Sequence, residues 1–216
     1  MKPTILFDLD GTLIDSTEAI IESFYHSFDA FDRKPPKQED IESKIGYTLE
    51  DIFSFLGIED EFIDRHVKAY KEHYRVISKE KTILLENARE AIELAGSFAT
   101  LGVVTTKTAR YSRELLEHFG VMDSFGALIG REDVINVKPH AEPIQKAIKA
   151  LNVERLEKHK IWMIGDTFLD IEAAKNADIK HVALMTGYGD KEELKKISDI
   201  FVKDALEAVE TIRKIY

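Results

Sequence analysis

Short apolar runs alternate with longer amphipathic segments through most of this chain. Residues 5–7, 98–105, 127–129, 161–164 and 182–184 are apolar stretches of strand length. Between and after them, apolar residues recur at helical spacing in residues 86–95, 109–119, 142–151, 171–176 and 204–215. Strands that alternate with helices are typical of an α/β fold built around a parallel sheet.

Residues 15–80 break this alternation because they contain only helical patterns. Helices are predicted from residue 15 to about residue 33, at 38–45, at 48–56 and at 59–78, with Pro35, Pro36, Gly46 and Gly57 as terminators. The pattern therefore predicts an all-helical domain at residues 15–80, inserted into an α/β core formed by residues 1–14 and 81–216.

The composition narrows the possible partners. The chain has 216 residues, of which 44% are hydrophobic and 32% charged, and its net charge is −10. This charge excludes long-range attraction to nucleic acid or an anionic membrane. Cysteine is absent, so disulfides and thiolate chemistry are excluded. The N-terminal residues form neither a signal peptide nor a membrane span, and a cytoplasmic location is expected.

The first apolar run ends in two carboxylates, Asp8 and Asp10, followed by Gly11 and Thr12. Ligands bind at the carboxyl ends of strands in open parallel sheets, and alternation along an extended chain points both acids to the same side. Mg²⁺ prefers such oxygen ligands. A phosphate would fit against the glycine and the threonine. The alternative is an ordinary polar turn after a strand.

Three further polar motifs come later in the chain, and two of them end apolar, strand-like runs. Thr105 and Thr106 end one run, and their hydroxyls and the following helix start suit phosphate oxygens, with a helix N-cap as the alternative. Lys138 precedes Pro139, which restricts the backbone that carries the ammonium group, with a solvated surface charge as the alternative. Asp166 ends another run, and Asp170 lies one helical turn later, near enough to share a cation, with a pair of acids capping a helix as the alternative.

These four motifs, in this order, resemble those of the haloacid dehalogenase superfamily of phosphotransferases. The resemblance implies a Rossmann-like, doubly wound parallel sheet with a small all-helical cap domain. It implies that Asp8 attacks phosphorus to form an aspartyl-phosphate and that Asp10 acts as general acid and base. Thr105 and Lys138 would bind the transferring group. Mg²⁺ would be bound by Asp8, the backbone carbonyl of Asp10, Asp166 and Asp170.

Family resemblance also guides the substrate prediction. An aspartate at residue 10 indicates phosphate ester or anhydride chemistry, and Leu49 stands where sugar-phosphate mutases carry Arg. A Mg²⁺-dependent phosphatase of the phosphoglycolate type is therefore expected, with a small phosphorylated metabolite as substrate and a monomer or homodimer as assembly. Tyr47 would face the leaving group, unless it is simply a buried aromatic residue.

Other functions remain compatible with the same residues. Pyrophosphatases, nucleotidases and sugar phosphatases share the catalytic set, and a receiver-like signalling module would accept phosphate on a strand-end aspartate without turnover. His66 and His73 are about 10 Å apart by helical rise, too far to share a metal, and are expected to be solvated or partly buried. Gly187-Tyr188-Gly189 lacks the spacing of a dinucleotide loop and is interpreted as a turn.

Overall fold

A computed structural model describes residues 2–216 and divides the chain into two units. Among the described residues, the first consists of residues 2–15 and 84–216, and the second of residues 16–83. The two connecting segments, β2 (Ile14–Asp15) and β3 (Ile83–Leu84), pair as a two-stranded sheet. No helix in the described part of the chain is both long and apolar enough to cross a bilayer.

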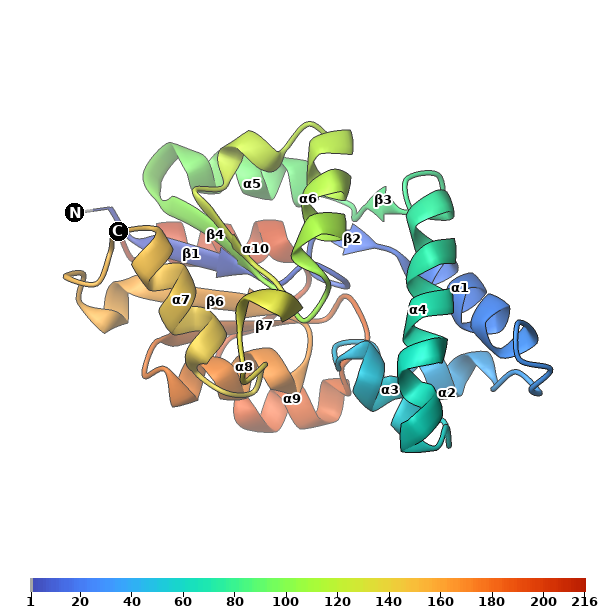
Figure 1. The fold of residues 1–216 in the computed structure, drawn as a ribbon. Coiled ribbons are helices and arrows are strands. Elements are labelled where there is room, and N and C mark those ends of the chain that lie inside the picture. Colours follow the sequence, from blue (N-terminus) through green and yellow to red (C-terminus); the bar gives the residue numbers. More distant parts are fainter. Residues whose placement is uncertain (1) are drawn as a thin grey trace. The chain divides into compact units, whose positions relative to one another are not determined.

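The first unit contains a six-stranded sheet in the order β5-β4-β1-β6-β7-β8, and every neighbouring pair is parallel. Its strands are β1 (Thr4–Phe7), β4 (Thr100–Val104), β5 (Ala127–Ile129), β6 (Ile161–Gly165), β7 (Lys180–Leu184) and β8 (Phe201–Val202). The chain begins in the middle of the sheet and builds outward in both directions, which confirms the predicted doubly wound α/β fold (Figure 1).

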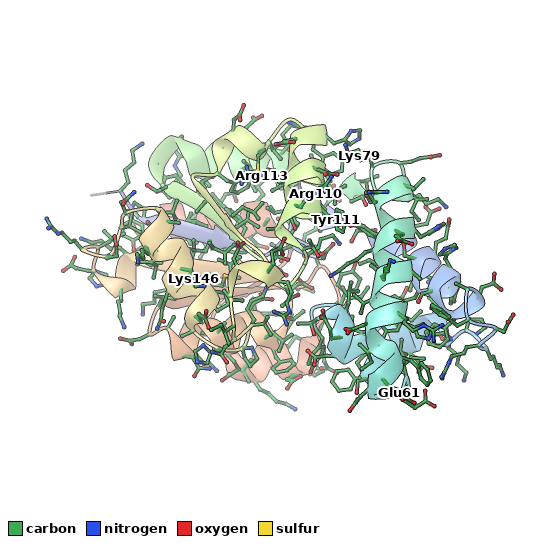
Figure 2. The ribbon with its side chains drawn as sticks, viewed as in Figure 1. Glu61, Lys79, Arg110, Tyr111, Arg113 and Lys146 are labelled. Carbon is green, nitrogen blue, oxygen red and sulfur yellow. The ribbon has the colours of Figure 1, made fainter. Side chains whose placement is uncertain are left out.

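Six α-helices connect and cover these strands. They are α5 (Ala88–Phe98), α6 (Ala109–His118), α7 (Glu142–Ala150), α8 (Phe168–Asn176), α9 (Lys191–Ile197) and α10 (Ala205–Arg213). Three short 3₁₀ helices lie at Met122–Ser124, Arg131–Asp133 and Lys158–Lys160. Figure 2 shows Arg110, Tyr111 and Arg113 on α6 and Lys146 on α7.

Alternation along the strands produces one apolar cluster on each face of the sheet. In β1, Ile5 and Phe7 pack in the cluster that includes α5 and α10, whereas Leu6 packs in the cluster with α7 and α8. In β6, Ile164 packs in the first of these clusters and Met163 in the second. Central strands that are buried on both faces are largely apolar, which is why they were predictable from short apolar runs.

The second unit consists of helices α1 (Thr17–Asp29), α2 (Gln38–Glu42), α3 (Leu49–Phe55) and α4 (Asp60–Ile77). Figure 2 labels Glu61 near the start of α4 and Lys79 just beyond its end. Aromatic rings form the core of this unit: the Phe24 ring centroid lies 4.8 Å from those of both Phe53 and Tyr70. The aromatic stripe of α4 is therefore core over Val67, Tyr70 and Tyr74, as its spacing predicted.

Helix α9 and the strands β2, β3 and β8 were not expected. Residues 191–197 are dominated by charge, and each of the three strands has only two residues. The sequence of β8 alone does not predict a strand, and its pairing with β7 stabilises the extended conformation. Helix α5 also extends to Phe98, which was expected to begin a strand.

Candidate active site

Three predicted site residues follow strands that are neighbours in the sheet. Asp8 follows β1, Thr105 follows β4 and Asp166 follows β6, and β1 lies between the other two. The backbone N–H of Asp8 still belongs to the sheet, since it donates to the carbonyl oxygen of Ile164 at 2.9 Å. Because the strands are parallel, all three side chains are brought to the same edge.

A cluster of buried carboxylates forms at this edge. Asp8, Asp166 and Asp170 each offer one oxygen, and these oxygens lie within 4.8 Å of one another. Thr12 Oγ1 donates to Asp166 Oδ1 at 2.9 Å. The backbone N–H and the hydroxyl of Thr167 donate to Asp170 Oδ2 at 3.0 and 2.7 Å. The carboxylates are therefore oriented by hydrogen bonds from outside the cluster.

Lys138 is a buried cation that lies against these carboxylates. Its Nζ donates to Asp8 Oδ1 at 2.8 Å, to Asp170 Oδ1 at 2.5 Å and to the carbonyl oxygen of Val104 at 3.2 Å. Burial lowers the pKa of Lys138, but Asp170 and Asp8 raise it more strongly, so its net shift is upward. The ammonium group stays protonated and bridges two of the three acids.

Burial dominates the electrostatics of the acids. The pKa of Asp8 is raised to about 7 in total. Burial is the main cause, Lys138 opposes the increase and Asp170 adds to it. The pKa of Asp166 is raised well above its usual value by burial and by the charges of Asp8 and Asp170. One ammonium group does not neutralise three carboxylates. This oxygen-rich, negatively charged donor set fits a divalent cation such as Mg²⁺.

The carboxylate of Asp10 lies outside this cluster and contacts Lys107. The Nζ of Lys107 lies 3.1 and 3.2 Å from the two carboxylate oxygens of Asp10, and both side chains are nearly buried. Sequence reasoning did not identify Lys107 as a site residue. Its position two residues after Thr105, at the same strand end, is the signal that would have indicated it.

The predicted phosphate-binding residues occupy the strand ends and the first loop. Thr105 is buried, and its Oγ1 accepts a hydrogen bond from the backbone N–H of Lys107 at 3.2 Å, while Thr106 is half-buried. Gly11 has φ +82°, and a Cβ there would lie 2.5 Å from Asp166 Oδ2. A side chain at residue 11 would therefore displace the acidic cluster.

The turn Gly187-Tyr188-Gly189 also belongs to this site, which the sequence did not indicate. The backbone N–H of Tyr188 donates to Asp166 Oδ2 at 2.9 Å. Gly187 has φ +75°, and a Cβ on it would lie 2.0 Å from the same oxygen. The turn was correctly interpreted as a turn, but its role in orienting Asp166 depends on the pairing of β6 with β7.

Tyr47 and the helix-borne histidines belong to the helical unit. The Tyr47 ring packs edge-on against Phe55, with 5.2 Å between ring centroids. His73 pairs with Glu22 at 3.1 Å. His66 is fully buried, with 1% of its surface exposed, rather than solvated or partly buried as expected, because aromatic residues surround it. In the core unit, His140 accepts from the backbone N–H of Glu142.

The class of protein to which this fold belongs is shown by a match to a known family. Residues 5–184 match the family model of the haloacid dehalogenase-like hydrolases, and the chain belongs to that family. This finding confirms the resemblance inferred from the four motifs, and the chain is accordingly an enzyme of the hydrolase class.

Several known proteins are similar to this chain in sequence or in fold. The chain is 35% identical to the pyrophosphatase PpaX of Halalkalibacterium halodurans over 82% of this chain and 80% of that protein. A predicted phosphatase from Clostridium acetobutylicum has 26% identity and a TM-score of 0.87 over 99% of both chains. A predicted phosphoglycolate phosphatase from Haemophilus somnus 129pt shares the fold, with a TM-score of 0.87, 21% identity and 97% coverage of both chains.

Proposed function

We propose that this protein is a Mg²⁺-dependent phosphatase that transfers a phosphoryl group from a small substrate to Asp8 and then to water. The observation that supports the proposal most strongly is the position of Asp8. It is buried, lies in a cluster with Asp166 and Asp170, and receives a 2.8 Å hydrogen bond from Lys138. A carboxylate in these surroundings is suited to covalent catalysis of phosphoryl transfer.

The chain's own residues divide the remaining tasks. Lys138 and Thr105 would bind the oxygens of the transferring group and so stabilise the charge that they carry in the transition state. Asp10 would protonate the leaving oxygen and later deprotonate the attacking water. Mg²⁺ bound by Asp8, Asp166, Asp170 and the carbonyl of Asp10 would reduce the repulsion between two anions. Gly11, Thr12 and Thr106 complete the loops around the phosphate.

Pyrophosphate is the first substrate that we propose. The relatives with 35–36% identity over more than four fifths of this chain are pyrophosphatases. Lys107 supports the same choice, since its ammonium group beside Asp10 places a cation where an anionic leaving phosphate would separate. Phosphoglycolate, which the sequence favoured, is the second candidate, because its leaving group also carries a negative charge.

The helical unit is proposed to act as the cap that selects the leaving group. Residues 16–83 form a compact unit joined to the core by two strands, an arrangement that suits a moving lid. Tyr47 and neighbouring residues 44–51, at the α2–α3 connection, are the proposed specificity segment. A receiver-like signalling module would have no use for this helical unit, which favours the phosphatase over that alternative.

A substrate panel with and without Mg²⁺ tests the proposal. Pyrophosphate, phosphoglycolate, nucleoside monophosphates and sugar phosphates are compared by phosphate release from wild type, Asp8→Asn and Arg113→Gln, the last an exposed control on α6. We expect Mg²⁺-dependent turnover of pyrophosphate that Asp8→Asn abolishes and Arg113→Gln preserves. Turnover that survives Asp8→Asn would remove Asp8 as the nucleophile, and stable phosphorylation without turnover would favour the receiver-like module.

A further inference from the structure

The helical unit contains a surface cavity that the proposed reaction does not use. Its volume is about 350 Å³, at the lower end of the range of small-molecule sites. It lies between the loop after α1 and the first half of α4. The lining residues that matter here are aromatic or charged: Phe31, Asp32, Arg33, Phe62, Arg65 and His66.

His66 lines this cavity and has one ring nitrogen that no described residue hydrogen-bonds. Its Nδ1 lies 2.9 Å from Ser27 Oγ. The Ser27 hydroxyl donates its one proton to the carbonyl oxygen of His66 at 3.0 Å, so Nδ1–H must be the donor to Ser27. Nε2 of the neutral ring is therefore a hydrogen-bond acceptor. Among the described residues it has no hydrogen-bond partner, although 99% of the residue is buried.

Two guanidinium groups lie over the aromatic wall of the same cavity. Arg65 sits 4.8 Å above the ring of Phe31 and 5.8 Å from that of Phe62, and no carboxylate in residues 2–216 pairs with it. Arg33 lies 5.4 Å from the Phe62 ring and pairs with Glu59 at 2.7 Å. That pair is partly exposed and therefore weak, so the Arg33 donors are accessible to a ligand.

The charge of the lining favours an anion. Two guanidinium groups face one lining carboxylate, that of Asp32, in a chain whose net charge is −10. The Glu59 carboxylate that pairs with Arg33 lies outside the lining. Burial, together with Arg33 and Arg65, lowers the pKa of His66, so its ring is neutral near pH 7. Arginine suits phosphate oxygens because its planar donors bind them in pairs. A neutral imidazole acceptor suits an anion that still carries a hydroxyl proton.

We propose that this cavity is a binding site for inorganic phosphate, in which Arg33 and Arg65 donate to phosphate oxygens and the P–OH group donates to Nε2 of His66. Hydrogen phosphate retains such a proton near neutral pH, whereas sulfate does not. Sulfate would therefore leave Nε2 unpaired and should bind more weakly. Phosphate is also the product of the proposed reaction, but the site is defined by its own residues and is tested by binding alone.

The experiment titrates inorganic phosphate into the full-length protein in EDTA, without substrate, while the ring ¹⁵N signals of the histidines are followed by NMR. Removal of metal weakens phosphate binding at the acidic cluster, and the absence of turnover separates this test from that of the proposed function. Sulfate is titrated in parallel. Arg65→Gln and Arg33→Gln are compared with Lys68→Gln on α4. Lys68 is exposed, and its one ion pair within residues 2–216, with Glu72, is 4.0 Å long.

The proposal requires a saturable shift of the Nε2 signal of His66, identified by its loss in His66→Gln. It also requires affinity for phosphate to fall about tenfold in each arginine variant, the effect of one lost charge-assisted hydrogen bond, and to be unchanged in Lys68→Gln. Should His66→Gln not fold, the arginine variants and the sulfate comparison decide the matter. An unmoved His66 signal, equal loss in all three variants, or sulfate binding as tight as phosphate binding overturns it.

Discussion

The Nζ of Lys107 lies 3.1 and 3.2 Å from the two carboxylate oxygens of Asp10. A cation so close to the proposed general acid can stabilise its carboxylate after proton transfer and can bind an anionic leaving group. Both effects depend on the charge rather than on the length of the side chain.

Lys107→Met should therefore lower kcat/KM for pyrophosphate by about 10²-fold, the lower end of what acid–base catalysis contributes. Steady-state kinetics in saturating Mg²⁺ would measure it, with Arg113→Gln as the control. Lys107→Arg, which keeps the charge, should retain more activity than Lys107→Met. Equal activity of the wild type and Lys107→Met would show that Asp10 works without this cation.

The hydrogen bond from Thr12 to Asp166 predicts an effect on Mg²⁺ activation. Thr12→Val removes the 2.9 Å bond while keeping the shape of the side chain, and loss of such an outer partner costs about 10–100-fold in metal affinity. The Mg²⁺ concentration for half-maximal activity should rise by that factor. Thr4→Val is the matched control, because the buried hydroxyl of Thr4 has no hydrogen-bond partner in the described part of the chain. A normal Mg²⁺ requirement in Thr12→Val would contradict this role.

Gly187 tests the close approach of the β7 turn to Asp166. A Cβ at residue 187 would lie 2.0 Å from Asp166 Oδ2, whereas one at Gly120, which also has positive φ, would meet nothing within 4 Å. Gly120→Ala should cost about 1–2 kcal/mol of unfolding free energy through backbone strain alone. Gly187→Ala should cost more and should also weaken Mg²⁺ activation. Denaturant unfolding and activity assays would separate the two effects, and equal behaviour of both variants would refute the contact.

The raised pKa of Asp8 predicts an unusual pH dependence of stability in metal-free protein. Between the ordinary value of 3.8 and about 7, the folded protein binds more protons at Asp8 than the unfolded chain does. Its contribution to stability therefore falls as pH rises through that window. Asp8→Asn removes this loss and should be ~2–4 kcal/mol more stable than the wild type at pH 8 in EDTA.

That difference should shrink toward zero as the pH falls below 3.8, where Asp8 is protonated in both the folded and the unfolded state. Denaturant unfolding at several pH values measures it, and the exposed Asp178→Asn serves as control. A constant difference between wild type and Asp8→Asn from pH 4 to pH 8 would contradict the raised pKa.

The sequence predicted those parts of the site that lie where local patterns end. Asp8 and Asp166 follow apolar runs, so both the strands and the position of their acids could be inferred from hydrophobicity alone. The same logic placed Thr105 beside them, because parallel strands deliver their carboxyl ends to one edge.

What the sequence did not reveal depends on contacts between distant segments. The role of Lys107 depends on its 3.2 Å contact with Asp10. The role of Gly187 depends on the close approach of its turn to Asp166. His66 was expected near solvent because its burial depends on rings from other segments, such as Phe28 and Phe53. The short strand β8 likewise forms through pairing with β7.

The most direct test of the central claim is to trap the phosphorylated enzyme. Wild type and Asp8→Asn are mixed with pyrophosphate and Mg²⁺, quenched in acid, reduced with borohydride and digested for mass spectrometry. Reduction of an aspartyl-phosphate yields homoserine, so the account predicts homoserine at residue 8 of the wild type and none in Asp8→Asn. Homoserine at another aspartate, or its absence from a wild type that is turning over under the same conditions, would contradict it.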